Sequence, residues 1–295
     1  MQPISLFLIG AHKAGTTSLQ YYLQSHPDIF MPEVTELEFF SDEQLYRRGE
    51  KYLDFHYQAV RDESVIGLPS VQLMFFPCVP ERLHRYNPDA KILAVLRNPI
   101  DRAYSAYWYH RRNGAESATT FEDALERDRT VGYKKYDYHQ QADFLYLEHG
   151  HYCEQINRFR AFFPPEQIHI VLTEDLRDRP QYWCELQQWL GVRQQPTTAA
   201  LQQRHNEASM PKAMWLQRLV KAADSPFKRV YRAAVPRPVR SFVTRNVTDR
   251  MISRNLVPFS YPPMKQATRD ALQAYFQPHN EALARLMGRS LEHWR

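Results

Sequence analysis

The chain has 295 residues, of which 43% are hydrophobic and 24% are charged, and its formal net charge is +5. This length and balance suit a globular protein with a full core, built as one large domain or as one domain with a small appendage. The longest apolar runs, PISLFLIGA and KILAVL, fall well short of the roughly 20 residues that a membrane-spanning helix needs. The sequence therefore predicts no membrane span.

The cysteines and the first residues bear on the compartment. Cys78, Cys153 and Cys184 are too few and too scattered for a disulfide framework or a zinc knuckle, so we expect reduced packing residues. The opening stretch MQPISLFLIG lacks the basic region and the small-residue cleavage site of a secretory signal. We interpret it as a buried strand and expect a cytoplasmic protein.

Short apolar runs alternate with helical patterns along most of the chain. The continuous apolar runs are typical of strands in a parallel sheet buried on both faces, and they cover residues 4–9, 64–67, 91–96 and 167–172. The helical patterns place apolar residues three and four apart, and they cover residues 16–25, 99–112, 119–128, 151–163, 180–191 and 264–288. This alternation predicts an α/β fold with a central parallel sheet of about four or five strands, flanked by helices on both faces.

The pattern weakens between about 197 and 262, where six prolines interrupt basic stretches. We expect short helices and loops there, laid over the core as a lid. The predicted organisation is a single domain, 1–295, with its core at about 1–196 and 263–295.

The positive charge is concentrated in this region. Residues 204–250 contain 11 Lys and Arg against 3 acidic residues. Within it, residues 215–245 interleave basic with apolar side chains, a pattern found most often on a solvated helix face but also on mobile lids and on surfaces that bind membranes or anionic polymers. We expect no nucleic-acid binding, because no recognised binding motif accompanies the basic residues.

A glycine loop follows the first predicted strand, in the stretch LFLIGAHKAGTT. Such a loop, placed between a strand and a helix, directs backbone N–H groups and the positive end of the helix dipole at an anion. Gly10 and Gly15 keep the spacing of a nucleoside-triphosphate loop, but Thr16 stands where its lysine would be and Lys13 supplies the cation from within. The site is suited to a shorter anion.

A second anion site is predicted at the end of the strand 91–96. A nucleoside-triphosphatase normally has a magnesium-binding aspartate after such a strand, whereas this chain has Arg97, which would repel a metal and attract a phosphate. Ser105 follows about two helical turns later. Two anion sites indicate a nucleotide with phosphates at both ends.

At this point the chain resembles a known family. The stretches GAHKAGTTSLQYYLQSHP, LRNPIDRAYSAYW and TRDALQAYFQPHNEALARLMGRSLEHW are similar to sulfotransferases that use 3′-phosphoadenosine-5′-phosphosulfate (PAPS), above all the carbohydrate and heparan-sulfate-type branch and its bacterial relatives. The resemblance covers nearly the whole chain. It implies that the 5′-phosphosulfate is held by Lys13, Ala14, Gly15, Thr16 and Thr17, the 3′-phosphate by Arg97 and Ser105, and that no metal is required.

The resemblance also implies a catalytic base. The family pattern KExxFF corresponds to TELEFF here, which places Glu36 as the base. Glu38, in a strand-like segment, is the alternative base. The non-catalytic interpretation is that both are solvated carboxylates beside a Phe-Phe core contact. Thr35 replaces the family's lysine. Leu68 and Leu73 replace polar groups expected to line the acceptor cleft, which makes a less hydrophilic acceptor conceivable.

Further side chains are weaker candidates. We interpret His26 and His151 as capping or packing groups and keep His56 as a reserve base, because a histidine serves as base in the cytosolic branch of the family. We expect Arg102 and Arg111 on a solvated face of the helix 99–112, and the alternative is that Arg102 supports the glycine loop. By resemblance, Asn206, Ser209 and Lys212 contact the nucleotide, with a surface loop as the equal alternative.

The sequence thus predicts a PAPS-dependent sulfotransferase, in which Glu36 takes the proton of an acceptor hydroxyl or amine and Lys13 stabilises the leaving adenosine bisphosphate. The acceptor, whether carbohydrate, lipid or small metabolite, stays open, as does the oligomeric state. Two alternatives remain: a P-loop nucleotide kinase or NTPase, and a non-catalytic glycan- or membrane-binding protein on the same scaffold.

Overall fold

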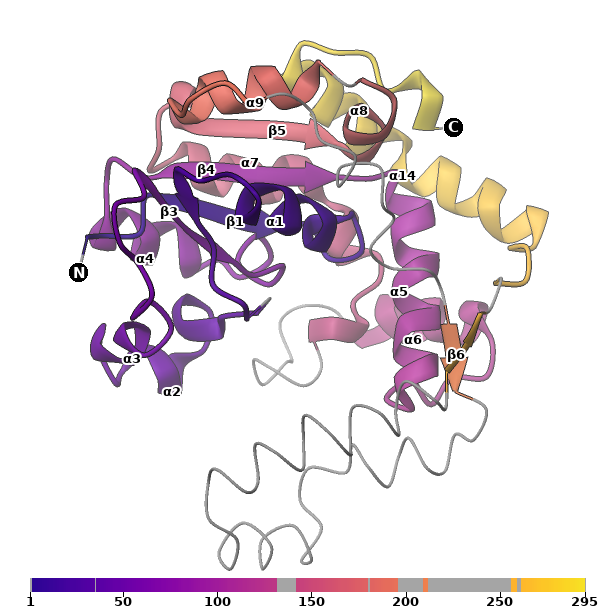
Figure 1. The fold of residues 1–295 in the computed structure, drawn as a ribbon. Coiled ribbons are helices and arrows are strands. Elements are labelled where there is room, and N and C mark those ends of the chain that lie inside the picture. The colour runs from indigo at the N-terminus through magenta and orange to yellow at the C-terminus, as the bar shows by residue number, and fades with distance from the viewer. Residues whose placement is uncertain are drawn as a thin grey trace, which may run out of the picture.

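Five parallel strands form the central sheet in the computed structural model of the chain, which describes residues 2–34, 36–131, 142–179, 181–195, 209–211, 256–258 and 261–294. Across this described part their spatial order is β2 (Ile29–Phe30), β3 (Val65–Pro69), β1 (Leu6–Gly10), β4 (Lys91–Leu96) and β5 (Ile168–Leu172), and every pairing is parallel. The predicted α/β fold is confirmed (Figure 1).

Burial on both faces explains the apolar runs. All five residues of β1 and of β3 are buried, and so are five of the six residues of β4. A strand covered on both sides shows no alternation of polar and apolar residues, so these strands were predictable from continuous runs. The two-residue strand β2 was missed because it is too short to give such a signal.

Helices cover the sheet on both faces. Their bounds are α1 Thr16–Gln24, α2 Glu43–Tyr46, α3 Lys51–Asp54, α4 Val79–Tyr86, α5 Pro99–Asn113, α6 Phe121–Val131, α7 Tyr152–Arg160, α8 Thr173–Asp178, α9 Tyr182–Leu190 and α14 Gln266–Met287. On one face α1 and α9 meet through Tyr22 and Trp183, whose ring centroids lie 6.3 Å apart. On the other face α7 packs against α4 and α14 (Figure 1). None of the helices described combines the length and apolar character of a membrane span.

The region predicted to hold short helices and loops contains a small sheet. Within it the structure describes β6 (Ser209–Pro211) and β7 (Leu256–Pro258), which pair antiparallel. Strands of three residues are too short to show a period in the sequence. Asn206, Lys212 and the basic stretch 215–245 lie outside the described residues, and the division into core and lid stays a prediction.

A second apolar cluster joins segments that lie far apart in the sequence. Ile100 of α5, Phe121 of α6 and Phe276 of α14 are among its buried members. Gly150 lies against it: a Cβ atom added there would sit 2.5 Å from Cε1 of Phe276 and 3.1 Å from Cβ of Pro99. The close approach at Gly150 thus lets α14 pack beside the start of α5.

Substituting Gly150→Ala is expected to destabilise the protein by about 1–3 kcal/mol, because the added methyl group overpacks this contact. Denaturant unfolding measures the change. In the Phe276→Leu background the smaller side chain relieves the clash, so the same substitution should cost less there. Equal costs in the two backgrounds would contradict this explanation.

Candidate active site

The glycine loop lies between β1 and α1, at the carboxyl edge of the sheet. Its backbone has positive φ at Gly10 (147°), at Lys13 (65°) and at Gly15 (101°). A Cβ atom at Gly10 would lie 3.1 Å from Cβ of Met74 and 3.2 Å from the carbonyl oxygen of Val71. Glycine at position 10 therefore permits both the backbone conformation and the close approach of the segment 70–74.

The loop leads into a helix N-terminus without a side-chain cap. Gly15 occupies the N-cap position of α1, and no side chain there bonds the first-turn amides. Thr16 is buried and Thr17 is half-buried at the start of the helix. Uncapped amides together with the helix dipole are suited to binding an anion, as the sequence predicts.

The backbone of Ala14 is already used within the protein. Its N–H donates to the carbonyl of Ala11 at 3.1 Å, and its carbonyl accepts from the Thr173 hydroxyl at 2.7 Å. Ala14 therefore shapes the loop, and the first-turn amides of α1 are the better candidates for contact with an anion.

Three cationic side chains gather at the loop. Nζ of Lys13 lies 4.3 Å from the ring centroid of Tyr109, and the Arg112 guanidinium lies 5.2 Å from the same centroid. Nη1 of Arg97 donates to the Lys13 carbonyl at 3.4 Å. Burial of the Lys13 amine, together with Arg112 and Arg97, lowers its pKa to about 8.

Sequence reasoning missed Arg112 and named Arg102 and Arg111 in its place. Ser105, Tyr109 and Arg112 are spaced four and three residues apart, so they share one face of α5. This spacing could have revealed the arginine. Ser105 is buried and Arg97 is half-buried, as suits two groups that hold an anion at the edge of a core.

Glu36 is anchored beside the loop. Its Oε2 accepts a hydrogen bond from the Val71 N–H at 3.0 Å, and the carbonyl of Val71 is the atom that Gly10 approaches. The same segment is tied to β1, because the N–H groups of Ser70 and Met74 donate to Leu8 and Ile9 at 3.0 and 2.8 Å. One short segment thus links the predicted base to the predicted phosphate loop.

The surroundings of Glu36 suit a base near neutral pH. The residue as a whole is exposed, but its carboxyl group is drawn in against Val71. Burial of this group raises its pKa to about 7, the Val71 hydrogen bond opposes the rise, and nearby Glu38 and Asp143 add to it. Asp143, which accepts from Nε2 of Gln72, was not found from the sequence.

The segment after Glu36 is a short helix. Residues Glu38–Phe40 form the 3₁₀ helix η1, so the prediction of a strand-like segment is wrong. Phe39 and Phe40 are both buried, and the Phe40 ring meets Phe7 of β1 edge-on at 5.5 Å. Core packing of the two phenylalanines thus fixes the backbone on which Glu36 and Glu38 stand.

Leu68 and Leu73 are core residues. Both are fully buried, Leu68 within β3 and Leu73 in the segment that follows it. Their apolar character is explained by packing under the sheet edge. They therefore give no support to a less hydrophilic acceptor.

Comparison with known proteins identifies the family. The family model "Sulfotransferase domain" matches residues 3–231. The chain belongs to the sulfotransferase domain family. The resemblance predicted from the glycine loop and LRNPIDRAYSAYW is confirmed, and with it the enzyme class.

Relatives show how this sulfotransferase domain is used elsewhere. The chain is 29% identical over 205 residues to a bifunctional heparan sulfate N-deacetylase/N-sulfotransferase of Drosophila melanogaster, covering 63% of the chain and 19% of the relative. It is 25% identical over 301 residues to bifunctional heparan sulfate N-deacetylase/N-sulfotransferase 3 of Homo sapiens, covering 97% of the chain and 30% of the relative. The chain therefore spans less than a third of these relatives. A sulfotransferase from Alicyclobacillus acidocaldarius has a similar structure, with a TM-score of 0.70, 27% identity and full coverage of both chains.

The other predicted residues of the sulfotransferase take different places. His26 is a packing group, as predicted: its Nε2 lies 2.8 Å from the Arg193 carbonyl oxygen and its Nδ1 accepts from the Asp28 N–H. His56 lies against the rings of Tyr52 and Phe55. Ser209 is in β6, where its backbone pairs with Pro258 of β7.

Arg102 is not on a solvated face. It is fully buried, and its Nη2 donates to the Tyr146 carbonyl. This correction arises because α5 is covered by its neighbours on more sides than its sequence suggests. Arg111 is half-buried.

Three buried histidines lie next to the loop. The His12 ring centroid is 5.6 Å from that of His110 and 6.2 Å from that of His149. Burial lowers the pKa of each, to about 4 for His110. They are therefore neutral near pH 7 and add no further positive charge beneath Lys13.

A group able to ligate a metal lies where α7 meets α14. Ligand atoms of His151, Glu154 and His279 all lie within 4.8 Å of one another in the described part of the chain. His151 also contacts the Tyr275 hydroxyl at 2.9 Å, which agrees with its interpretation as a packing group. That the reaction needs no metal stays a prediction.

The lowered pKa of Lys13 predicts pH-dependent anion binding. A protonated amine holds an anion and a neutral one does not, so affinity for adenosine 3′,5′-bisphosphate should be full well below pH 8 and fall as the pH rises through about 8. Calorimetric titrations across this range measure it. In Lys13→Arg the group stays charged, so this alkaline loss should disappear; the same loss in both proteins would contradict the assignment.

Proposed function

We propose that this sulfotransferase moves the sulfuryl group of PAPS to an oxygen or nitrogen of its acceptor. The observation that carries the proposal is the link between the Glu36 carboxyl group and the glycine loop through Val71. It sets a base beside an anion site, as a transfer reaction between two bound reactants requires.

The cationic side of the site fits PAPS. A buried lysine amine beside two guanidinium groups is destabilised unless an anion joins it, and the lowered pKa of Lys13 records this crowding. The 5′-phosphosulfate would be held by Lys13, Gly15, Thr16 and Thr17, and the 3′-phosphate by Arg97 and Ser105. Arg112 adds a cation to this set.

The protein's own groups have separate tasks in the reaction. PAPS supplies an activated sulfuryl group, whose bond to the 5′-phosphate breaks as the acceptor bonds to sulfur. Glu36, ionised above its raised pKa, takes the acceptor proton. Lys13 and the first-turn amides of α1 neutralise the charge that develops on the leaving phosphate oxygen.

An amine is the acceptor group that the site favours. Glu36, Glu38 and Asp143 place three carboxyl groups near one another, which attracts a cationic amine, and Glu38 and Asp143 make Glu36 a stronger base for its proton. The names of the relatives, heparan sulfate N-sulfotransferases, support an amino sugar in a glycan. A cytoplasmic location, a bacterial source and membrane or polymer contact through 215–245 stay predictions.

Replacing the base should separate turnover from binding. In Glu36→Gln we expect turnover to fall by about 10²–10⁴-fold with affinity for adenosine bisphosphate nearly unchanged, because an amide cannot accept the proton. The wild-type rate should fall as the pH drops through about 7, and this acidic limb should vanish in the variant. The exposed Glu33→Gln is the matched control, and full activity in Glu36→Gln would remove Glu36 as the base.

Nucleotide choice tests the proposal against a kinase or NTPase. Thr16 replaces the lysine and Arg97 replaces the aspartate of a magnesium–triphosphate site. Calorimetry should therefore show adenosine 3′,5′-bisphosphate binding without magnesium at least about tenfold tighter than ATP with magnesium. Tighter binding of ATP with magnesium would favour the alternative.

A further inference from the structure

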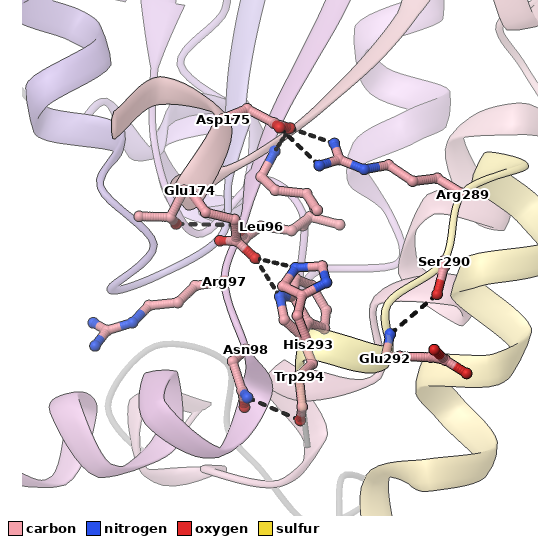
Figure 2. A network of polar contacts seen from close by, with 12 residues as sticks. Leu96, Arg97, Asn98, Glu174, Asp175, Arg289, Ser290, Glu292, His293 and Trp294 are labelled. Carbon is pink, nitrogen blue, oxygen red and sulfur yellow. Dashed lines mark hydrogen bonds and ion pairs between the residues drawn. The ribbon is translucent and has the colours of Figure 1, made fainter. Parts of the chain in front are cut away.

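The segment that follows α14 returns to the carboxyl edge of the sheet, where Arg97 lies. It runs from Gly288 to Trp294 and ends in the 3₁₀ helix η8 (Glu292–Trp294). Figure 2 shows its side chains meeting Glu174 and Asp175, which follow β5, and the Trp294 carbonyl meeting Asn98, the residue next to Arg97. We call residues 288–294 the closing segment.

The first anchor of the closing segment is an ion pair between half-buried Arg289 and buried Asp175. Both terminal guanidinium nitrogens of Arg289 bond the Asp175 carboxylate, at 2.5 and 2.8 Å, and Asp175 is 2% exposed (Figure 2). One oxygen of Asp175 also accepts from the Leu172 N–H at 3.2 Å. Because a buried carboxylate needs its partner, this pair fixes the closing segment to the end of β5.

The second anchor is Trp294, which is 2% exposed. Its carbonyl accepts from Nδ2 of Asn98 at 2.9 Å, and Oδ1 of Asn98 accepts from the Ile100 N–H at 2.9 Å, which caps α5 (Figure 2). The indole N–H donates to Glu174 at 2.5 Å. Trp294 thus orients the residue directly after Arg97.

Tyr152 supports Arg97 from the other side. Its ring meets the Trp294 ring edge-on at 6.2 Å, and its hydroxyl donates to the Arg97 carbonyl at 2.8 Å. The Arg97 backbone is therefore held through its own carbonyl and through Asn98, and both supports rest on Trp294.

The segment that the two anchors contact also reaches the glycine loop. The Thr173 hydroxyl lies 2.7 Å from the carbonyl oxygen of Ala14 and 3.0 Å from that of Leu96. Its neighbours Glu174 and Asp175 hold Trp294 and Arg289. Residues 173–175 thus connect the closing segment to both predicted anion sites.

We propose that Arg289 and Trp294 are positioning residues for the nucleotide site: they touch no reacting atom, but they set the place of Arg97 and of the glycine loop. This inference rests on the proposed function. A shift of the Arg97 backbone moves its guanidinium away from the phosphate that it would bind, so nucleotide affinity falls while the base, Glu36, keeps its contact with Val71.

The test measures nucleotide affinity and turnover in Arg289→Ala and Trp294→Phe. We expect the Kd of adenosine bisphosphate and the KM of PAPS to rise about tenfold, with kcat at saturating PAPS changed much less. Arg289→Lys should restore part of the affinity. Arg177→Ala, which breaks an exposed pair with Asp178 on α8, is the matched control.

A double-variant cycle distinguishes positioning from general destabilisation. In the Arg97→Ala background, Trp294→Phe should weaken binding little further, because its effect acts through Arg97. Unchanged affinity in folded Trp294→Phe, or fully additive effects in the cycle, would overturn the inference while leaving the proposed function intact. A wild-type protein that does not bind adenosine bisphosphate would overturn both.

Discussion

The crowding of positive charge at the glycine loop is the constraint on which the site depends. Lys13, Arg97 and Arg112 meet at the edge of a buried sheet, where water screens their repulsion poorly. The fold keeps them together because each stands on a different element: the glycine loop, the residue after β4 and the helix α5. Neutral histidines beneath the loop avoid adding to the repulsion. The anionic ligand that we propose would offset the repulsion that remains.

Negatively charged side chains lie a short distance away along the same edge of the sheet. Burial of the Glu36 carboxyl group raises its pKa to about 7, and nearby Glu38 and Asp143 add to the rise. The segment 70–74 contacts Glu36 and Asp143, and it also lies against Gly10 of the glycine loop. A base that was paired directly with Lys13 would stay ionised and weakly basic, so this separation is what lets a carboxylate accept a proton near pH 7.

Local signals in the sequence identified much of this arrangement. The strands β1, β3, β4 and β5 are continuous apolar runs, and Lys13 and Arg97 follow such runs directly, so the carboxyl edge of a parallel sheet had to bring them together. Arg112 shares a helix face with Ser105, so its spacing was a usable signal, but Asp143 could not be placed in this way because its role depends on how residues 142–144 pack against distant segments. Burial was equally hidden: Arg102 and Leu68 were misjudged because nothing local shows which neighbours cover them.

The closing segment shows why such a site needs residues far along the chain. Arg97 lies one residue beyond β4, which ends at Leu96, so its backbone has freedom that the strand pairing does not remove. Asn98, Tyr152 and Trp294 remove it with two hydrogen bonds and one ring contact, all made by buried or half-buried groups. Because the arginine side chain is long, a small movement of its backbone displaces the guanidinium group further. Restraint of the backbone therefore fixes the position of the guanidinium group better than added contacts at the group itself. In the proposed site, η8 therefore supports the arginine that β4 places at the edge of the sheet.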